Sequence, residues 1–216
     1  TLTGLTGSMT ITQKSLTIAS PTIASKTYNG STTTGTITPG TLSGVISPET
    51  INVTATGTFS NANVGTAKTA TVVYTLADGT NGGLATNYSL ANGSGTGDIT
   101  AAPLTITGVT ANNKTYDGTT AATLSGTAAY SGLVNGETFT VTGTPTATFA
   151  SANVGTGIAV TVTGYTAPSS NYSITQPSLT ANITSAGSTI TATGTTSYTY
   201  NGLAQGPASS TVTGST

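Results

Sequence analysis

The chain has 216 residues, carries four Lys and five acidic residues, and has a net charge of −1 at pH 7. Four Lys without Arg cannot neutralise a track of phosphates, which disfavours nucleic-acid binding. The absence of His and Cys excludes zinc sites of the usual ligand types and thiol or Ser–His catalysis. No apolar run approaches the roughly 20 residues of a membrane-spanning helix.

An internal repeat organises the chain. Residues 26–30, Lys-Thr-Tyr-Asn-Gly, return 88 positions later as Lys-Thr-Tyr-Asp-Gly at 114–118. Thr-Tyr-Asn-Gly follows again at 199–202, 84 positions after the second copy. A repeat of this length indicates a copied structural unit. Residues 1–14 are interpreted as the tail of a preceding repeat, 15–102 and 103–186 as complete repeats, and 187–216 as the start of a truncated one.

The residues of each repeat predict β structure. Alternation of apolar residues with Thr, as in residues 139–142 and 158–163, is typical of strands, and Thr itself favours the extended chain. No segment has the apolar spacing of a helix. In the second repeat we expect strands at 103–108, 114–118, 121–128, 137–150, 157–166, 170–175 and 179–184. Seven strands in 84 residues favour tandem immunoglobulin-like β-sandwiches; β-grasp-like repeats and a β-solenoid are the alternatives.

The aligned copies also predict a core. The inward residues expected in the first repeat are Leu16, Ile18, Tyr28, Phe59, Val64, Val72, Tyr88 and Ile99. Their counterparts in the second repeat are Leu104, Ile106, Tyr116, Phe149, Val154, Val162, Tyr172 and Ile183. Tyr28, Tyr116 and Tyr200 each precede an Asn/Asp-Gly pair ending in Gly30, Gly118 and Gly202, which suits a tight turn. We expect these tyrosine rings to pack in the core and their hydroxyls to find partners near the turn.

The junction between the two complete repeats contains no Gly and no long polar linker, since residues 99–106 read Ile-Thr-Ala-Ala-Pro-Leu-Thr-Ile. Pro103 restricts its own φ and favours an extended conformation at Ala102. The sequence therefore predicts a stiff, roughly linear array of repeats.

Three segments carry a family resemblance: Lys-Thr-Tyr-Asp-Gly-Thr-Thr at 114–120, Phe-Ala-Ser-Ala-Asn-Val-Gly-Thr-Gly at 149–157 and Asn-Tyr-Ser-Ile-Thr-Gln-Pro at 171–177. They resemble the YDG-type repeat domain of large bacterial exoproteins, including filamentous-haemagglutinin-like adhesins. The first copy departs with Asn29, and the last has Tyr198 in place of the Lys. The resemblance implies an extracellular, β-rich stalk and brings no enzymatic residues.

The sequence offers few residues for catalysis or metal binding. The five acids are scattered, and Asp78 with Asn81, or Asp117 alone, is a thin calcium site, so we expect tight turns instead. A crosslink from Lys26 or Lys114 to Asn63 or Asn153 is disfavoured, because the last copy has no Lys. We expect the Lys side chains to guard a strand edge instead. No catalytic, cofactor or metal site is expected, and the chain is not expected to be an enzyme.

Two functions of different class follow. The first is a structural stalk or fibre segment of a secreted bacterial surface protein, with neighbouring repeats or copies of the same protein as partners. The incomplete repeat at 187–216, with Ile190 and Val212, would then be completed by a neighbour. The alternative is an adhesive module whose loops recognise glycan or a cell-surface receptor, with Tyr130 and Tyr198 as the best exposed aromatic candidates.

Overall fold

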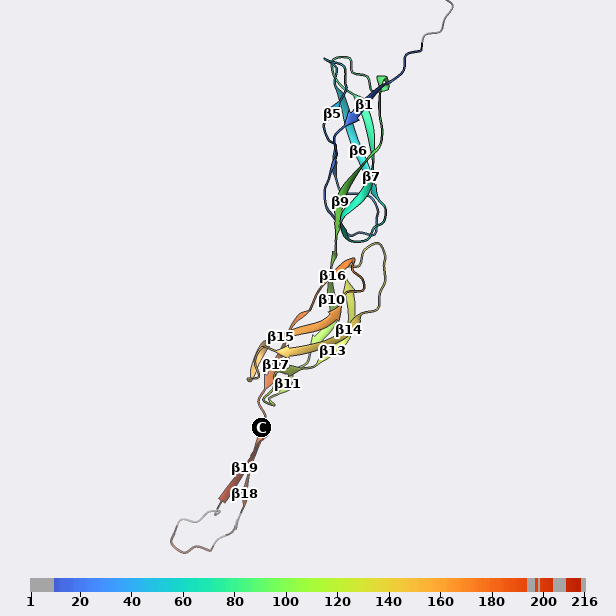
Figure 1. Ribbon diagram of the computed structural model, residues 1–216. Coiled ribbons are helices and arrows are strands. Elements are labelled where there is room, and N and C mark those ends of the chain that lie inside the picture. Colours follow the sequence, from blue (N-terminus) through green and yellow to red (C-terminus); the bar gives the residue numbers. More distant parts are fainter. Residues whose placement is uncertain (1–9, 194–196, 198, 204–208, 215–216) are drawn as a thin grey trace, which may run out of the picture. The chain divides into compact units, whose positions relative to one another are not determined.

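The computed structural model describes residues 10–193, 197, 199–203 and 209–214 (Figure 1). In this part of the chain there is no α-helix, only a single 3-10 turn, η1 (Ala85–Asn87). The fold is therefore all-β, as predicted. The chain divides into two compact units, which are described separately: residues up to Pro103 with Leu133–Glu137 and Ser169–Ser173, and the remainder.

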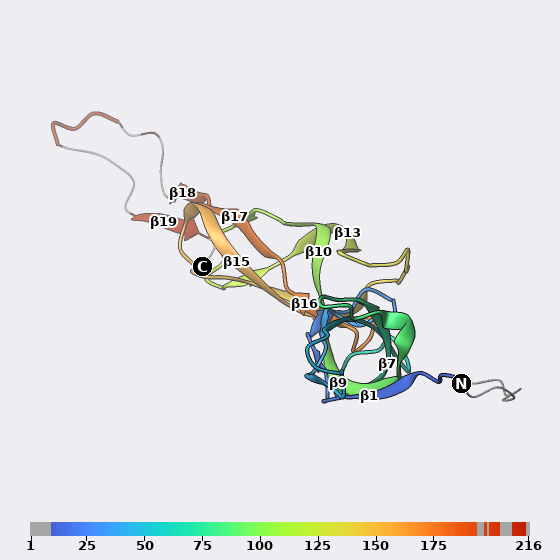
Figure 2. The ribbon, with the colours of Figure 1, turned by 90° about the horizontal axis from the view of Figure 1, so that it is seen from above.

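The first unit is built around a long antiparallel hairpin. Strands β6 (Ile51–Phe59) and β7 (Gly65–Asp78) pair in continuous register from Ile51↔Asp78 to Phe59↔Ala70. Their burial alternates because successive side chains of a strand point to opposite faces, which places Phe59 and Val72 inside. Seen from above, the strands of this unit are arranged in a ring (Figure 2).

The remaining strands of the first unit complete three sheets. A four-stranded sheet has the order β3-β9-β7-β6, a three-stranded sheet the order β5-β1-β8, and β2 pairs with β4. The added strands are β1 (Lys14–Ile18), β2 (Thr22–Ile23), β3 (Lys26–Thr27), β4 (Ile37–Thr38), β5 (Leu42–Ser43), β8 (Tyr88–Leu90) and β9 (Gly93–Thr100).

The second unit packs two sheets face to face. Their strand orders are β11-β17-β15-β14-β12 and β13-β10-β16, and the first residues of β10 and β16 belong to the first unit. Ile106 of β10 shares one apolar cluster with Phe149, Val160 and Ile183 of the larger sheet, which makes this unit a β-sandwich. The strands are β10 (Ala102–Ala111), β11 (Lys114–Thr115), β12 (Ala121–Ala122), β13 (Leu124–Ser131), β14 (Thr142–Phe149), β15 (Gly155–Thr166), β16 (Tyr172–Thr175) and β17 (Ser178–Thr184).

Several predicted strand limits in the second repeat need correction. The segment predicted as one strand at 121–128 is divided between β12 and β13, and 137–150 is a strand only from Thr142 onward. Glu137 instead closes a turn, in which its amide donates to the Val134 carbonyl at 3.0 Å, and residues 138–141 have no regular secondary structure. Turn hydrogen bonds of this kind compete with a β ladder for the same backbone groups.

The last described strands pair with each other. β18 (Ser188–Thr193) and β19 (Ser209–Gly214) form a two-stranded antiparallel sheet in which Ile190 lies opposite Val212. Ile190 is exposed. The expectation that a neighbour completes this segment stays a prediction, but these two strands already satisfy part of each other's backbone.

Most of the predicted core is buried, but two of its positions are half-buried and two are exposed. Tyr116 is 36 % exposed and Val154 is 55 % exposed, whereas the equivalent Tyr28 is 7 % exposed and Val64 is half-buried, as is Ile18. Tyr200 is also exposed. The aligned copies share a local backbone conformation, but different residues pack against them. The buried members of the predicted core are Leu16, Tyr28, Phe59, Val72, Tyr88, Ile99, Leu104, Ile106, Phe149, Val162, Tyr172 and Ile183.

The junction between β9 and β10 is a single residue, Ala101. Ala102 and Leu104 on either side of Pro103 are both buried. The stiff, linear array expected from this junction stays a prediction.

Truncating the core of the second unit should destabilise it strongly. Phe149 is 2 % exposed within the apolar cluster. Phe149→Ala should lower the free energy of unfolding by about 3–5 kcal/mol, the usual cost of removing a buried aromatic ring. Phe139→Ala is the control, because Phe139 is 43 % exposed and should cost much less. Urea denaturation measures both, and equal losses would contradict this assignment of the core.

Candidate functional site

The repeated Tyr-Asn/Asp-Gly motif forms the same turn in all three copies. The side-chain oxygen of Asn29, Asp117 or Asn201 accepts a hydrogen bond from the backbone N–H two residues later, at 3.1, 2.9 and 3.1 Å respectively. The glycines that follow have φ of 74°, 74° and 83°. Such a turn needs a short polar side chain followed by a residue that tolerates positive φ, which explains the residue types.

A lysine braces this turn in the first two copies. Lys26 Nζ donates to the carbonyl oxygens of Ser31 and Thr33, both at 2.8 Å. Lys114 Nζ donates to Asp117 Oδ1 at 2.8 Å and to the Thr119 carbonyl at 2.7 Å, and it lies 5.5 Å from the centre of the Phe149 ring. These side chains tie the loop to itself, which is a more specific role than the edge guard expected from the sequence.

The acid in the second copy responds to this lysine. Hydrogen bonds from Lys114 first, and from Thr119, lower the pKa of Asp117 from 3.8 to about 2. Burial alone lowers the pKa of Lys26, whose turn has the uncharged Asn29 at the position that Asp117 occupies in the second copy. The one-residue difference between the copies therefore changes the electrostatics of the turn without changing its geometry.

The cluster around Tyr28 is the best-defined polar site of the first unit. Glu137 Oε1 accepts a hydrogen bond from the Tyr28 hydroxyl, and Glu137 Oε2 accepts one from the Tyr172 hydroxyl at 2.7 Å. The two tyrosine rings meet edge to face, with centroids 5.5 Å apart and planes at 78°. This arrangement is favourable for aromatic pairs. Tyr28 comes from the first sequence repeat, and both of its partners come from the second.

A second set of contacts lies in the same unit. The Val64 amide donates to Asn171 Oδ1 at 2.9 Å, and Asn171 Nδ2 donates to Asn63 Oδ1 at 3.2 Å. Gly30 is packed so tightly on Asn135 that a Cβ at Gly30 would lie 2.8 Å from the Asn135 Cβ. Side chains from the two repeats therefore interlock at several points of one compact unit.

The environment favours the neutral tyrosines. The hydrogen bond to Glu137, followed by burial, raises the pKa of Tyr28 above 10. Burial is the main cause that raises the pKa of Tyr172. Both hydroxyls thus stay protonated well above neutral pH, which is the form that can donate to a carboxylate.

The first repeat carries its own version of half of this cluster. The Tyr88 hydroxyl donates to Glu49 Oε2 at 2.5 Å and accepts from the Ile46 amide at 3.2 Å. In the second repeat the Tyr172 hydroxyl likewise accepts from the Val134 amide at 3.2 Å. The bond to Glu49 is the main cause that raises the pKa of Tyr88.

The sequence pointed to the tyrosines of this site but missed their acceptor. Tyr28, Tyr88 and Tyr172 were expected in the core, and all three are buried. Glu49 and Glu137 are the only glutamates of the chain and are separated by the repeat offset of 88. This spacing is the signal in the sequence that the two glutamates occupy equivalent positions. Only the folded chain, however, brings Tyr28 to Glu137.

Other expected features have structural roles. Asp78 Oδ1 accepts from the Ala85 amide at 2.7 Å, and Asn81 Nδ2 donates to the Pro48 carbonyl at 2.9 Å, so both side chains serve the loop. Among the described residues there is no group of three or more His, Cys, Asp or Glu that could hold a metal ion. In the same part of the chain no helix is long and apolar enough to cross a membrane.

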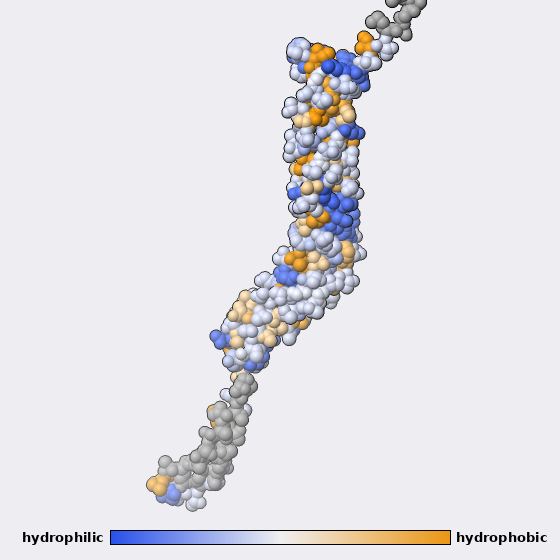
Figure 3. Space-filling model, in the orientation of Figure 1, coloured by the Kyte–Doolittle hydropathy of each residue, from blue (hydrophilic) through white to orange (hydrophobic). Residues whose placement is uncertain are grey.

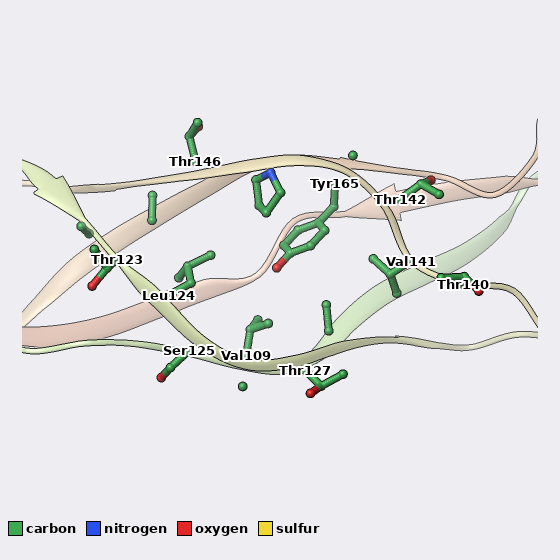
Figure 4. A pocket seen from close by; sticks show the side chains of 16 residues that line it. Val109, Thr123, Leu124, Ser125, Thr127, Thr140, Val141, Thr142, Thr146 and Tyr165 are labelled. Carbon is green, nitrogen blue, oxygen red and sulfur yellow. The ribbon is translucent and has the colours of Figure 1, made fainter.

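The second unit has an open hollow of about 910 Å³ between β13 and β14 (Figure 4). Val109, Leu124, Val141 and Tyr165 give it an apolar lining, with Thr side chains around them. Tyr130 does not form an exposed platform, because it is half-buried and its hydroxyl donates to the Thr166 carbonyl at 2.6 Å. Tyr198, the other aromatic candidate, lies outside the described residues.

The hydroxyl of Tyr28 should matter more than that of Tyr116. Tyr28→Phe keeps the ring but leaves Glu137 without one of its two donors, so the free energy of unfolding of the first unit should fall by about 1–3 kcal/mol. Tyr116→Phe is the matched control, and it should stay within about 0.5 kcal/mol. Chemical denaturation with hydrogen exchange of the first-unit strands measures both. Similar effects of the two variants would contradict the role of this cluster.

The Lys114–Asp117 pair should make stability acid-sensitive. Because the pKa of Asp117 is lowered from 3.8 to about 2, its stabilising contribution is present above about pH 4 and is lost between pH 4 and pH 2. Asp117→Asn, which copies the residue of the first repeat, should reduce this acid dependence. Thermal melting at pH 5 and pH 2 measures the difference. Asn29→Asp, the reverse exchange beside Lys26, should increase it; a variant pair with unchanged acid dependence would refute the assignment.

One known domain family matches this chain. The YDG domain matches residues 12–96 and 100–181, which is most of the chain. No significant match was found among curated proteins or among solved structures. The two matched regions contain the turn of Tyr28, the turn of Tyr116 and the three Tyr–Glu hydrogen bonds. The chain therefore belongs to the YDG domain family and carries two copies of this domain in tandem.

Proposed function

We propose that this chain is a stalk or fibre segment of a large secreted bacterial surface protein, where it spaces or builds an adhesive extracellular filament. Its partners in this role are neighbouring repeats or copies of the same protein. Its location is extracellular, in a secreted or cell-surface-attached form. Its work is mechanical and needs no catalytic group, cofactor or nucleic acid.

One observation carries this proposal. The first compact unit contains Leu133–Glu137 and Ser169–Ser173, which belong to the second sequence repeat. A unit that borrows segments from the next repeat resists separation from it, because pulling them apart must break the bonds at Glu137 and Asn171. Such interlocking suits a chain that transmits force along its length.

The surface chemistry supports the same role. Figure 3 shows that most of the face in view has intermediate hydropathy, with smaller strongly hydrophilic and strongly hydrophobic areas between. Threonine hydroxyls form hydrogen bonds with one another across strands, as in the Oγ1 pairs Thr142–Thr166 at 2.8 Å and Thr146–Thr163 at 3.1 Å. A surface that is polar but nearly uncharged has little long-range repulsion between neighbouring molecules.

A second candidate function rests on the hollow of the second unit. An adhesive module could hold part of a glycan or a cell-surface receptor against Val109, Leu124 and Tyr165. The hollow favours an occupant with both apolar faces and hydroxyl groups, because its apolar lining is edged by Thr and Ser. Glycan-array binding that is lost on Tyr165→Ala, with the fold retained, would favour this function over the stalk.

Stretching the chain between its ends tests the stalk proposal. In single-molecule force spectroscopy we expect two separate unfolding events, each releasing on the order of 300 Å, since a repeat of 84–88 residues extends by up to about 3.5 Å per residue. Glu137→Gln should lower the force of one event and leave the other unchanged. Gradual extension without distinct events would contradict a mechanical role. Antibodies against the chain should also label intact cells of the producing organism; labelling only after lysis would refute the extracellular location.

A further inference from the structure

Two strand edges border the hollow of the second unit. In the part of the chain that the structure describes, β13 is the outer strand of its sheet, and β14 pairs with β12 only at Ala147 and Thr148. Residues 122–128 and 140–143 line the hollow without a gap, although successive side chains of a strand point to opposite faces. The backbone edges themselves, with their N–H and C=O groups, therefore face the hollow.

The two edges differ in how well they are protected from pairing with a further strand. β14 carries Pro145, which has no N–H to donate, and the Thr142 amide already donates to the Tyr130 hydroxyl at 3.3 Å. β13 contains neither Pro nor a charged residue, which are the usual protections of an exposed edge. A further strand can therefore add to β13, with β14 as the opposite wall of the hollow.

The chemistry of the lining selects the occupant. In Figure 4 the side chains of Val109, Leu124, Val141 and Tyr165 lie between the strands, and no residue of the lining is charged or carries an amide side chain. A glycan site normally presents such polar groups or an exposed aromatic platform, whereas Tyr165 is only 8 % exposed. The uncharged lining instead favours an uncharged occupant with apolar side chains, because a buried charge would have no partner there.

The first unit shows what closes the same side of the fold. Gly57 pairs there with Val72, as Ala147 pairs with Val162 in the second unit. Ile37 of β4 lies against Gly57, so that a Cβ built at Gly57 would be 2.6 Å from Ile37 Cδ1. An aliphatic side chain from an extended segment therefore covers the position whose counterpart, Ala147, lines the hollow.

The hollow lies apart from the contacts that interlock the repeats. Segments of the second repeat meet the first unit at Tyr28 and Val64. The counterparts of these two residues in the second repeat are Tyr116 and Val154, and neither of them lines the hollow. The hollow is thus a feature of the repeat itself, formed by residues between 109 and 165.

We infer that the hollow binds an extended, uncharged segment of a partner protein, which adds as a strand to β13. Apolar side chains at alternate positions of the segment lie on the apolar lining, and small polar side chains face the solvent. The edge from Leu124 to Ala128 matches about five strand residues, or roughly 17 Å. A folded second copy is excluded as occupant, because a strand between β13 and β14 needs both of its own edges free.

Peptide binding to the full chain tests strand addition. The probe is fluorescein-labelled Ser-Val-Thr-Val-Thr-Val-Ser with blocked ends, and fluorescence anisotropy measures its binding. Two control peptides keep every side chain but carry backbone N-methyl groups, one on its valines and the other on its Ser and Thr residues. Each control lacks the N–H donors of one strand edge, so one should bind at least about tenfold more weakly and the other like the probe.

Two neighbouring alanines of β13 provide matched variants of the protein. Ala128 lines the hollow, whereas Ala129 is exposed and lies outside the lining. Ala128→Leu should fill part of the hollow and weaken binding of the probe at least about fivefold, and Ala129→Leu should leave it unchanged. Circular dichroism on heating shows whether each variant keeps the fold. The methylated peptides decide the matter on the parent chain if Ala128→Leu does not fold.

Three results would overturn the inference. The first is equal binding of all three peptides, or no binding of the probe. The second is glycan binding that Ala128→Leu abolishes without any peptide binding, which would keep the adhesive module but give the hollow to a sugar. The third is a dimer that the same variant dissociates, which would give the hollow to a second copy. The inference rests on the second candidate function, and its failure leaves the stretching experiment and the stalk proposal unaffected.

Discussion

The carboxylate of Glu137 holds together groups that the sequence places far apart. Each of its oxygens accepts a hydrogen bond from the hydroxyl of a buried tyrosine. Tyr28 comes from one repeat and Tyr172 from the other. Without this acceptor, two hydroxyls in an apolar setting would lose a charge-assisted partner, which costs more than an ordinary surface hydrogen bond. Glu137 is the last residue of Leu133–Glu137, a segment of the second repeat that belongs to the first unit. One of only two glutamates in the chain therefore has an effect far beyond its own loop.

The three Tyr-Asn/Asp-Gly turns separate local structure from tertiary burial. All three form the same side-chain to backbone hydrogen bond and the same positive φ at glycine. The tyrosine before the turn is nevertheless buried at Tyr28, partly exposed at Tyr116 and exposed at Tyr200. The turn positions the ring, and whether it becomes core depends on whether another segment covers it. A motif that presents an aromatic ring in this way is suited to joining units.

Threonine allows this surface to be polar with almost no charge. Its hydroxyl forms hydrogen bonds with residues of neighbouring strands, as in the Thr110–Ser125 pair at 3.0 Å. Its branched Cβ favours the extended backbone. The chain thereby gives up the charged side chains that usually discourage strand edges from pairing. In return, contacts between such surfaces depend little on salt, which fits a molecule built for association outside the cell, as proposed above.

The sequence alone determined the all-β class, the repeat period, the turns and most of the core, because these follow from local periodicity and from residue types that suit one backbone conformation. Phe59, Phe149, Tyr88 and Tyr172 are buried for that reason. The tertiary structure decided which copies of the repeated turn are covered by another segment. Tyr116 and Val154 have nearly the same local sequence as Tyr28 and Val64, yet they are exposed because no segment equivalent to Leu133–Glu137 lies against them in the described structure. Burial is a property of the neighbour as much as of the residue, and a repeat pattern cannot reveal which neighbour is present.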